Sequence, residues 1–453
     1  MVQLTEFLLD LVIRRFDNDS SGEDKMSNLR SLGLFLTESC NLACPYCFAA
    51  NMEREAIDKD LAKKAIDLLF HDDVKSQKVH ITFWGGEPLL EFKLMKELVL
   101  YAEQQAEKHE KQLRLGFPTN TILLSDDIID FLQEHNVRPS LSLDGDEAAQ
   151  SLRRNRGGKS SFPKALEKLE LIKKRYGKQL PGVRMTVSPA TADSLYHNVR
   201  FFLDQGFRAV HFAPVHEADW SSEVISAYKQ QQLKLADEWI DRFLKGTPFH
   251  VSVWEKSLAW LELCRRQKTT ADGKQNGVPC GAGDGMLAVD IYGDIYACHR
   301  FVFYDKQKRA EGLGNVRNGL PKKEQLQPYL EFDAHTLGTA ETRCADCEHR
   351  PDCFNTCPAV NYSMTGDIFS IHSRFCQLTR IDFEVAREIE TRIGDHEKFL
   401  DYRDNYLLKN YAPGSLSASA LAFFADIDEE TENRFVDRVE DILQNIQEKR
   451  RKK

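Results

Sequence analysis

The chain contains no long apolar run, no secretion signal and no excess of basic residues. A membrane-spanning helix needs ~20 consecutive apolar residues, so the sequence excludes an integral membrane protein. The N-terminal stretch MVQLTEFLLDLVIRRF is interrupted by Glu6, Asp10 and Arg14, and we interpret it as an amphipathic helix. The net charge of −9 gives no electrostatic reason to expect nucleic acid as a partner. The 453 residues, 42% hydrophobic and 29% charged, instead fit a soluble globular protein of two or three domains.

Cysteine, by contrast, is abundant. The chain has eleven cysteines, an odd number, and most are grouped in CxxC-like spacings. Disulfides of secreted domains usually join distant cysteines in short chains, whereas grouped cysteines are typical of metal sites. We therefore predict metal or cluster ligation in a reducing compartment, the cytoplasm.

Three of these cysteines, Cys40, Cys44 and Cys47, stand together in the stretch TESCNLACPYCFA, with no fourth ligand nearby. A closed zinc site needs four ligands. Three thiolates, however, can hold three corners of a [4Fe-4S] cube and leave its fourth iron open to a second molecule. The alternatives are a zinc site completed by a distant histidine, such as His80 or His211, and simple buried thiols.

Short β-branched or apolar runs alternate with amphipathic segments of helical length from Gly33 to about Leu244. This order predicts an α/β fold with a parallel sheet, either an open wound sheet or a partial (β/α)6 barrel of the TIM type. The expected strands are 34–36, 79–83, 113–119, 139–143, 183–187 and 209–214. In both folds the ligand site lies in the loops at the carboxyl ends of the strands.

Unusual motifs follow four successive strands. The cysteine motif follows the first strand, WGGEP (84–88) the second, PTNT (118–121) the third and SLDG (142–145) the fourth. Since the carboxyl ends of parallel strands meet at the same edge of a sheet, we expect all four motifs to line one pocket.

A second, small domain organised by its ligands is expected where the remaining cysteines concentrate. Between Cys264 and Cys376 helical periodicity weakens, and MLAVDIYGDIYACHRFV predicts short strands. The rest of the chain is typical of helices without cysteine. The expected domains are a helical extension (1–30), the barrel (31–245), the cysteine-rich domain (246–379) and a helical tail (380–453).

The motif CxxxCxxC followed by GGEP resembles the radical S-adenosylmethionine (SAM) superfamily. The resemblance implies a [4Fe-4S] cluster on the three grouped cysteines, with its open iron chelating the amino and carboxylate groups of SAM. It also implies that Gly85, Gly86 and Glu87 contact the methionine part of SAM, and that Tyr46 offers a face to the adenine. Reductive cleavage of SAM would then give a 5'-deoxyadenosyl radical that takes hydrogen from the substrate.

Three more positions match the family one by one. Ser142 in SLDG resembles the serine that contacts the ribose of SAM in peptide-modifying members. Arg154 resembles the arginine that pairs with the carboxylate of SAM, and Val210 would be an apolar contact of the adenine. The alternatives are a surface arginine beside Arg153 and Arg156, and a plain core valine.

The later cysteines resemble a SPASM domain, which carries auxiliary iron–sulfur clusters. Seven cysteines and Gly293 fall at the spacings of this domain. The resemblance assigns a farther, closed cluster to Cys344, Cys347, Cys353 and Cys376. It assigns a nearer cluster to Cys280, Cys298 and Cys357, which makes three [4Fe-4S] clusters in the chain. A pair of zinc knuckles is the alternative.

Two departures from the family pattern concern the nearer cluster. The first is that only three cysteines are assigned to it. Either Cys264 supplies its fourth ligand, or one iron is open to a substrate thiolate and Cys264 is a buried structural thiol. Sulfatase maturases place an aspartate, as general base, directly after the cysteine that matches Cys298, whereas this chain has His299. Histidine can accept a proton, and we predict His299 as the catalytic residue.

The stretch around ACHRF looks closer to maturases that install thioether or carbon–carbon crosslinks in ribosomal peptides, such as those acting on six-cysteine SCIFF peptides. We therefore predict a maturase whose partners are a precursor peptide or protein and a flavodoxin- or ferredoxin-type reductant, without nucleic acid or membrane. A sulfatase maturase and a non-catalytic, zinc-stapled binding module are the alternatives. Only 33 residues precede Leu34, too few for a winged-helix leader-binding domain. A separate protein, the N-terminal helix or the tail segment SALAFFADI would then recognise a leader.

Overall fold

The computed structural model describes residues 26–49, 55–267, 280–303, 312–332, 337, 344, 347, 353 and 357–408. The predicted N-terminal helix and the tail segment SALAFFADI lie outside these residues. Within the described ranges, none of the helices combines the length and the apolarity that crossing a membrane requires.

Six parallel strands, each paired with its neighbour in chain order, form the main sheet. They are β1 Ser31–Thr37, β2 Lys78–Gly85, β3 Gln112–Thr119, β4 Val137–Ser142, β5 Val183–Val187 and β6 Val210–Pro214. Every residue of β1 is buried, as expected for a parallel strand that is covered on both faces. The predicted α/β fold with a partial barrel is confirmed.

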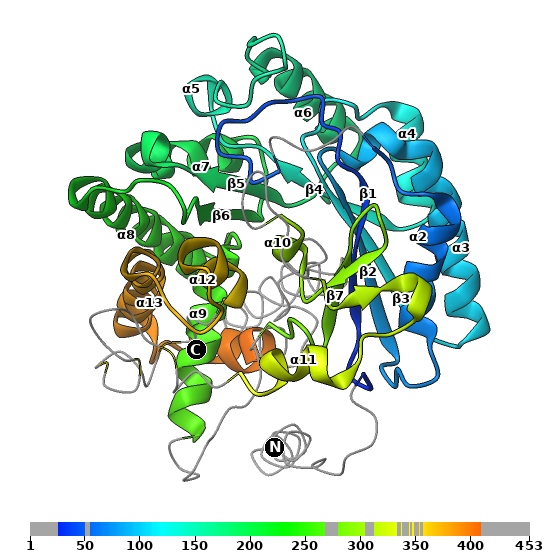
Figure 1. The fold of residues 1–453 in the computed structure, drawn as a ribbon. Helices are drawn as coiled ribbons and strands as arrows, with labels where there is room; N and C mark the ends of the chain where they lie inside the picture. The colour runs from blue at the N-terminus through cyan, green and yellow to red at the C-terminus, as the bar shows by residue number, and fades with distance from the viewer. Residues whose placement is uncertain are drawn as a thin grey trace, which may run out of the picture.

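Helices connect the strands and cover the outer face of the sheet. They are α2 Lys59–Asp67, α3 Phe92–Lys108, α4 Asp126–Glu134, α5 Glu147–Gln150, α6 Phe162–Tyr176, α7 Leu195–Asp204 and α8 Ser222–Lys245. Figure 1 shows α2, α3 and α4 along one flank of the strands, and α7 and α8 on the opposite side. Local capping fixes their starts: the Asp58 carboxylate accepts from the first amides of α2, and Ser125 Oγ accepts from Ile128 N in α4.

The cysteine-rich region continues the same sheet. Its strand β7 pairs in parallel with β1, with Gly33 opposite Ala288, and β8 and β9 follow antiparallel. The elements are α9 Ser252–Gln267, β7 Met286–Val289, β8 Asp294–Tyr296, α10 His299–Val302, β9 Gly314–Asn315, α11 Lys323–Leu330, α12 Pro358–Thr365, α13 Ser373–Ile393 and α14 Glu397–Tyr402. The short strands predicted in this region are therefore present. The predicted domain limits stay predictions, and α13 runs across the one at 379.

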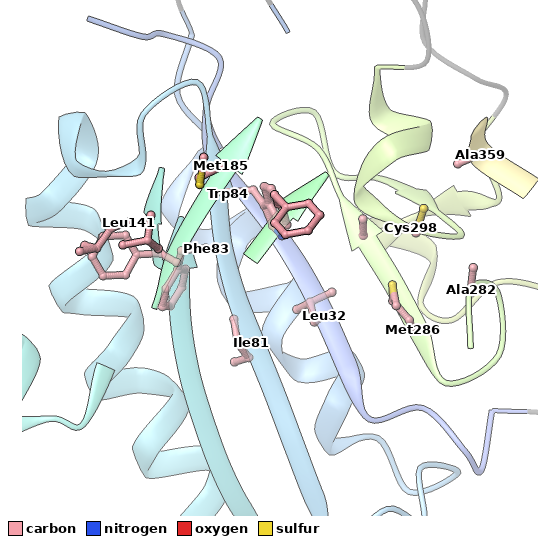
Figure 2. Close-up of a cluster of buried hydrophobic side chains, with 14 of the residues drawn as sticks. Leu32, Ile81, Phe83, Trp84, Leu141, Met185, Ala282, Met286, Cys298 and Ala359 are labelled. Carbon is pink, nitrogen blue, oxygen red and sulfur yellow. The ribbon is translucent and has the colours of Figure 1, made fainter. Parts of the chain in front are cut away.

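The hydrophobic core is shared between the barrel and the cysteine-rich region. Figure 2 shows part of it, with Ile81 and Phe83 on β2, and Met286 and Cys298 on the side of β7 and α10. The inner face of the sheet, opposite to the helices, is more polar. On β4, β5 and β6 it carries an inner row of neighbouring side chains, Ser142, Arg184 and His211. Apolar packing thus stabilises the outer layer, and polar side chains stand on the inner row.

A buried carboxyl group on α13 predicts a pH-dependent stability. Asp382 accepts a hydrogen bond from Gln232 Nε2 on α8 at 3.0 Å and lies near Tyr228. Burial raises the pKa of Asp382 to about 7, although the bond from Gln232 opposes this. As pH rises from the ordinary pKa of an aspartate to about 7, the unfolded chain loses its proton first, and the folded state loses stability.

We therefore expect Asp382→Asn to be more stable than the wild type by on the order of 2 kcal/mol at about pH 8, and by clearly less at about pH 5. Denaturant unfolding at the two pH values measures the difference. Asp193→Asn, at an exposed position, serves as the control. A gain that is the same at both pH values would contradict the assignment.

Candidate active site

The cysteine loop, residues 38–49, leaves the carboxyl end of β1 and brings three thiols together. Cys40, Cys44 and Cys47 are half-buried. Burial, Glu87 and the neighbouring thiols raise the pKa of Cys40 to about 12, although a backbone hydrogen bond from Leu42 opposes this. Burial and the Cys47 thiol likewise raise the pKa of Cys44 to about 11. Each thiol is thus within electrostatic reach of another, as a shared ligand would require.

The glycines of WGGEP allow the chain to approach the cysteine loop closely. Gly86 N donates to Thr37 O at 3.0 Å, and Glu87 N donates to Ser39 O at 2.9 Å. A Cβ atom on Gly86 would stand 2.4 Å from Ser39 O and 2.8 Å from Cys40 Cβ, and one on Gly85 would stand 2.8 Å from Thr37 O. From the family resemblance these glycines are expected to admit a ligand, and the structure shows that they also admit the loop backbone.

Glu87 joins the loops after β2 and β3. Its carboxylate is fully buried and accepts from Thr119 Oγ1 at 2.9 Å, Asn120 N at 2.7 Å and Leu89 N at 3.2 Å. Burial raises its pKa to about 7, and these hydrogen bonds limit the rise. Asn120 Nδ2 then donates to Asn41 Oδ1 in the cysteine loop at 2.7 Å. The motifs WGGEP and PTNT therefore meet the cysteine loop in one place, as predicted.

A buried ion pair ties the fourth motif to the same loop. Arg153 Nε and Nη2 donate to the two carboxylate oxygens of Asp144, each at 2.9 Å, and both side chains are nearly inaccessible to water. Tyr46 Oη donates to the same carboxylate, and the Arg153 guanidinium lies 5.5 Å from the Tyr46 ring centre. Thr186 N on β5 donates to Asp144 Oδ1 at 2.9 Å. Asp144 thus connects β4, β5 and the cysteine loop.

Arg153 and the role of Asp144 were missed by the sequence analysis, which chose the neighbouring Arg154. The structure places Arg154 at the surface, where its Nε donates to Ser151 O. Ser142 lies half-buried at the end of β4, near the motifs. Val210 is fully buried in the hydrophobic core, which fits the alternative of a core valine. The contacts of Ser142, Arg154 and Val210 with SAM stay predictions.

The two histidines considered as zinc ligands lie on the inner row of the sheet. His80 is fully buried, with Nε2 3.4 Å from Thr82 Oγ1. His211 Nδ1 accepts from Ser252 N at 3.0 Å. Burial lowers the pKa of His80 to about 3 and that of His211 to about 4, so both rings are neutral at pH 7. Among the described residues, no group of three or more His, Cys, Asp or Glu side chains has the geometry to hold a single metal ion.

The later cysteines fall into two sets. The first set is Cys280, Cys298 and Cys357: burial, then the Cys357 thiol, raises the pKa of Cys280 to about 11, and burial together with Cys357 and Cys280 raises that of Cys298 further. The second set surrounds Cys376, whose pKa burial and its neighbours raise to about 12, the neighbours being Cys344, Cys353 and Cys347. The structure thus brings together the same thiols that the resemblance assigns to each cluster. Cys264 belongs to α9, and its side chain lies outside the described residues.

His299 connects the first cysteine set to WGGEP. Its ring stacks on Trp84, with ring centres 4.1 Å apart and planes 10° apart, and Figure 2 shows Trp84 between the strands and the side of Cys298. Burial, Arg184 and Arg300 hold its pKa well below the ordinary value. Directly after α10, Phe303 contacts Phe48 of the cysteine loop at 6.4 Å between ring centres. The segment that carries Cys298 therefore packs directly on the SAM-type motifs.

Comparisons with known proteins agree with this geometry. The family model of the radical SAM superfamily matches residues 34–200. A serine-type anaerobic sulfatase-maturating enzyme of Bacteroides thetaiotaomicron is 27% identical over 72% of this chain and 82% of its own length. Mycofactocin maturase MftC of Mycolicibacterium smegmatis is 26% identical over 72% of this chain and 77% of its own. The solved structure "Native anSMEcpe with bound AdoMet and Cp18Cys peptide" has the same fold, with a TM-score of 0.63 at 20% identity over 81% of this chain and 99% of that one.

These matches extend beyond the family model, because 72% of the chain is longer than the stretch 34–200. The motifs that the resemblance rested on lie together in the structure, at the carboxyl ends of β1 to β4. Residues 34–200 therefore form a radical SAM domain, which takes S-adenosylmethionine and a [4Fe-4S] cluster as cofactors, and the chain is related to the anaerobic sulfatase maturases and to MftC.

Proposed function

We propose that this enzyme is a maturase that abstracts hydrogen from a ribosomally made peptide and installs a thioether or carbon–carbon crosslink. The observation that supports this most is the contact between the cysteine loop and the segment that carries Cys298. His299 on α10 packs on Trp84, and Phe303, directly after α10, packs on Phe48, which follows Cys47. Radical chemistry and an auxiliary cluster would thus share one site, and the relatives named above carry out maturation reactions.

The cysteine loop fits the cluster that the family uses. Its donor set is three grouped thiols, which suits a cube with one iron left for SAM. Gly85 and Gly86 let the backbone lie against the loop. The Asp144 carboxylate, which is paired with Arg153, accepts a hydrogen bond from Tyr46 and so fixes its position. When bound, the reduced cluster and SAM supply a 5'-deoxyadenosyl radical. The residues of the chain hold these groups in place and exclude water from them.

The two later cysteine sets would hold auxiliary [4Fe-4S] clusters. The set around Cys376 has the four thiols that a closed cube needs, and the set around Cys298 has three. Thiols whose pKa values are raised by burial and by one another bind metal with release of their protons. In the three-thiol set the fourth position is left for Cys264 or for a substrate thiolate.

His299 is the residue we propose to contact the substrate and accept its proton. It is 7% exposed, and within the described residues its Nδ1 atom is buried without a hydrogen-bond partner. A buried polar atom without a partner costs stability, and a substrate thiol or hydroxyl would satisfy it. Its stack on Trp84 fixes the plane of the ring, so that this atom keeps one direction.

Formylglycine formation on a sulfatase is the second candidate, because several relatives are sulfatase maturases. His299 in place of the expected aspartate argues against it. Two probes separate the candidates under anaerobic conditions with SAM and dithionite. One is a synthetic six-cysteine peptide of the SCIFF type, and the other is a synthetic peptide with the Cys-x-Pro-x-Arg sulfatase site.

We expect only the cysteine-rich peptide to lose a pair of hydrogen atoms by mass, with 5'-deoxyadenosine formed alongside it. For a thioether product, the modified cysteine no longer reacts with iodoacetamide. Conversion of the Cys-x-Pro-x-Arg peptide to an aldehyde would instead assign a sulfatase maturase. If the protein binds zinc and little iron and modifies neither peptide, it would be a binding module.

A further inference from the structure

Arg300 stands between the cysteine loop and the three-thiol set. It follows Cys298 by two positions on α10 and forms an ion pair with Glu217, in the loop after β6. On its other side the guanidinium lies 5.9 Å from the ring centre of Phe48. About a quarter to a third of both charged side chains is exposed, 28% for Arg300 and 35% for Glu217, so water still reaches the pair.

Glu217 is held by a second segment of the cysteine-rich region. Ser363 Oγ on α12 lies 2.9 Å from Glu217 Oε1 and 3.0 Å from Val360 O, and its one proton is shared between these two acceptors. Helix α12 begins directly after Cys357. The ion pair is therefore attached to the chain on both sides of the set, at Cys298 through Arg300 and at Cys357 through Ser363.

The charges around Arg300 are asymmetric. Burial works against its charge, but Glu217, Cys357 and Cys298 raise its pKa, so the guanidinium stays protonated at any working pH. The Cys298 and Cys357 sulfurs thus have a permanent positive charge near them, and this charge is paired with the Glu217 carboxylate. The backbone N–H groups of Arg300 and Phe301 also favour the thiolate of Cys298.

We propose that Arg300 is a positioning residue that raises the reduction potential of the auxiliary cluster on Cys280, Cys298 and Cys357, and that Glu217 moderates this effect. The proposal rests on the proposed function in one respect, the presence of that cluster. A reduced cluster carries one more negative charge than an oxidised one, so a nearby cation stabilises the reduced form and a nearby anion destabilises it.

The test is a potentiometric titration followed by EPR spectroscopy on the full chain, reconstituted anaerobically. Cys40, Cys44 and Cys47 are replaced by alanine in every sample, so that only auxiliary clusters contribute. The variants on this background are Arg300→Gln, Arg300→Lys and Glu217→Gln. Arg392→Gln is the matched control, because Arg392 also forms an ion pair between two segments, with Asp237 on α8, but has no cysteine among its partners in the structure described.

We expect Arg300→Gln to shift the midpoint potential of one cluster to more negative values and Glu217→Gln to shift it to more positive values. Arg300→Lys and Arg392→Gln should stay close to the background potential. Opposite shifts cannot arise from a common loosening of the fold, which would move both variants in the same direction. If Arg300→Gln fails to hold a cluster, the positive shift of Glu217→Gln decides.

The inference about Arg300 would be wrong if all variants had equal potentials, or if Arg300→Gln and Glu217→Gln shifted the potential in the same direction. The proposed auxiliary cluster would still stand in that case. A background protein that binds no auxiliary iron at all would overturn the proposed auxiliary cluster and the inference with it. Iron and sulfide analysis before the titration distinguishes the two failures.

Discussion

Replacing Gly86 with alanine is expected to lower the rate of 5'-deoxyadenosine formation about 100-fold, because a displacement of reacting groups by about 1 Å has an effect of that size. The new Cβ would stand 2.4 Å from Ser39 O and 2.6 Å from Ser39 C, both backbone atoms of the cysteine loop. Neither side can yield by a side-chain rotation, so the loop must move. SAM cleavage by the reconstituted variant measures the effect.

The control for this variant is Gly182→Ala. A Cβ there would meet its nearest atom, Ala209 Cβ, at 3.6 Å, which is ordinary contact. We expect wild-type SAM cleavage and wild-type stability from it. If Gly86→Ala were as active as Gly182→Ala, the close approach of WGGEP to the loop would not matter for the reaction.

Arg153→Met is expected to destabilise the folded state by about 3 to 5 kcal/mol, since it leaves the buried Asp144 carboxylate without its cation. The same carboxylate accepts from Tyr46 in the cysteine loop and from Thr186 on β5, so the loop loses its fixed position as well. We expect lower iron incorporation together with the lower stability. Denaturant unfolding under anaerobic conditions and iron analysis measure the two effects.

Arg154→Met is the matched comparison, because it alters the neighbouring arginine at the surface. From its exposure we expect little change in stability. It also tests the role that the family resemblance assigned to Arg154. A large rise in the KM for SAM with unchanged stability would support contact with the SAM carboxylate, and unchanged kinetics would remove that role.

The sequence predicted the barrel because the six parallel strands carry local signals. The run Val183–Val187 is short, alternates apolar with polar residues and is bounded by turns, and the structure places this strand at the predicted residues. Four motifs at successive strand ends then predicted a shared site without any knowledge of contacts. That three cysteine sets hold clusters remains a prediction, although the thiols of each set lie near one another.

Two features could not be predicted from the sequence. The pairing of Gly33 with Ala288 joins β1 to β7, which comes after all six barrel strands in the sequence, and no local pattern records a partner at that separation. Arg153, and not Arg154, points into the protein because of the way the chain turns after α5. Adjacent arginines give no periodic signal from which this could be predicted. Both are set by tertiary packing.

The central claim is that the three cysteine sets hold three cubane clusters, of which one belongs to the SAM site. The most direct measurement is iron and sulfide analysis with Mössbauer spectroscopy on the anaerobically reconstituted chain and on its Cys40, Cys44, Cys47 triple alanine variant. We predict about twelve irons per wild-type chain and about eight in the variant, all in [4Fe-4S] form. Bound zinc with little iron, or equal iron in both proteins, would contradict the account.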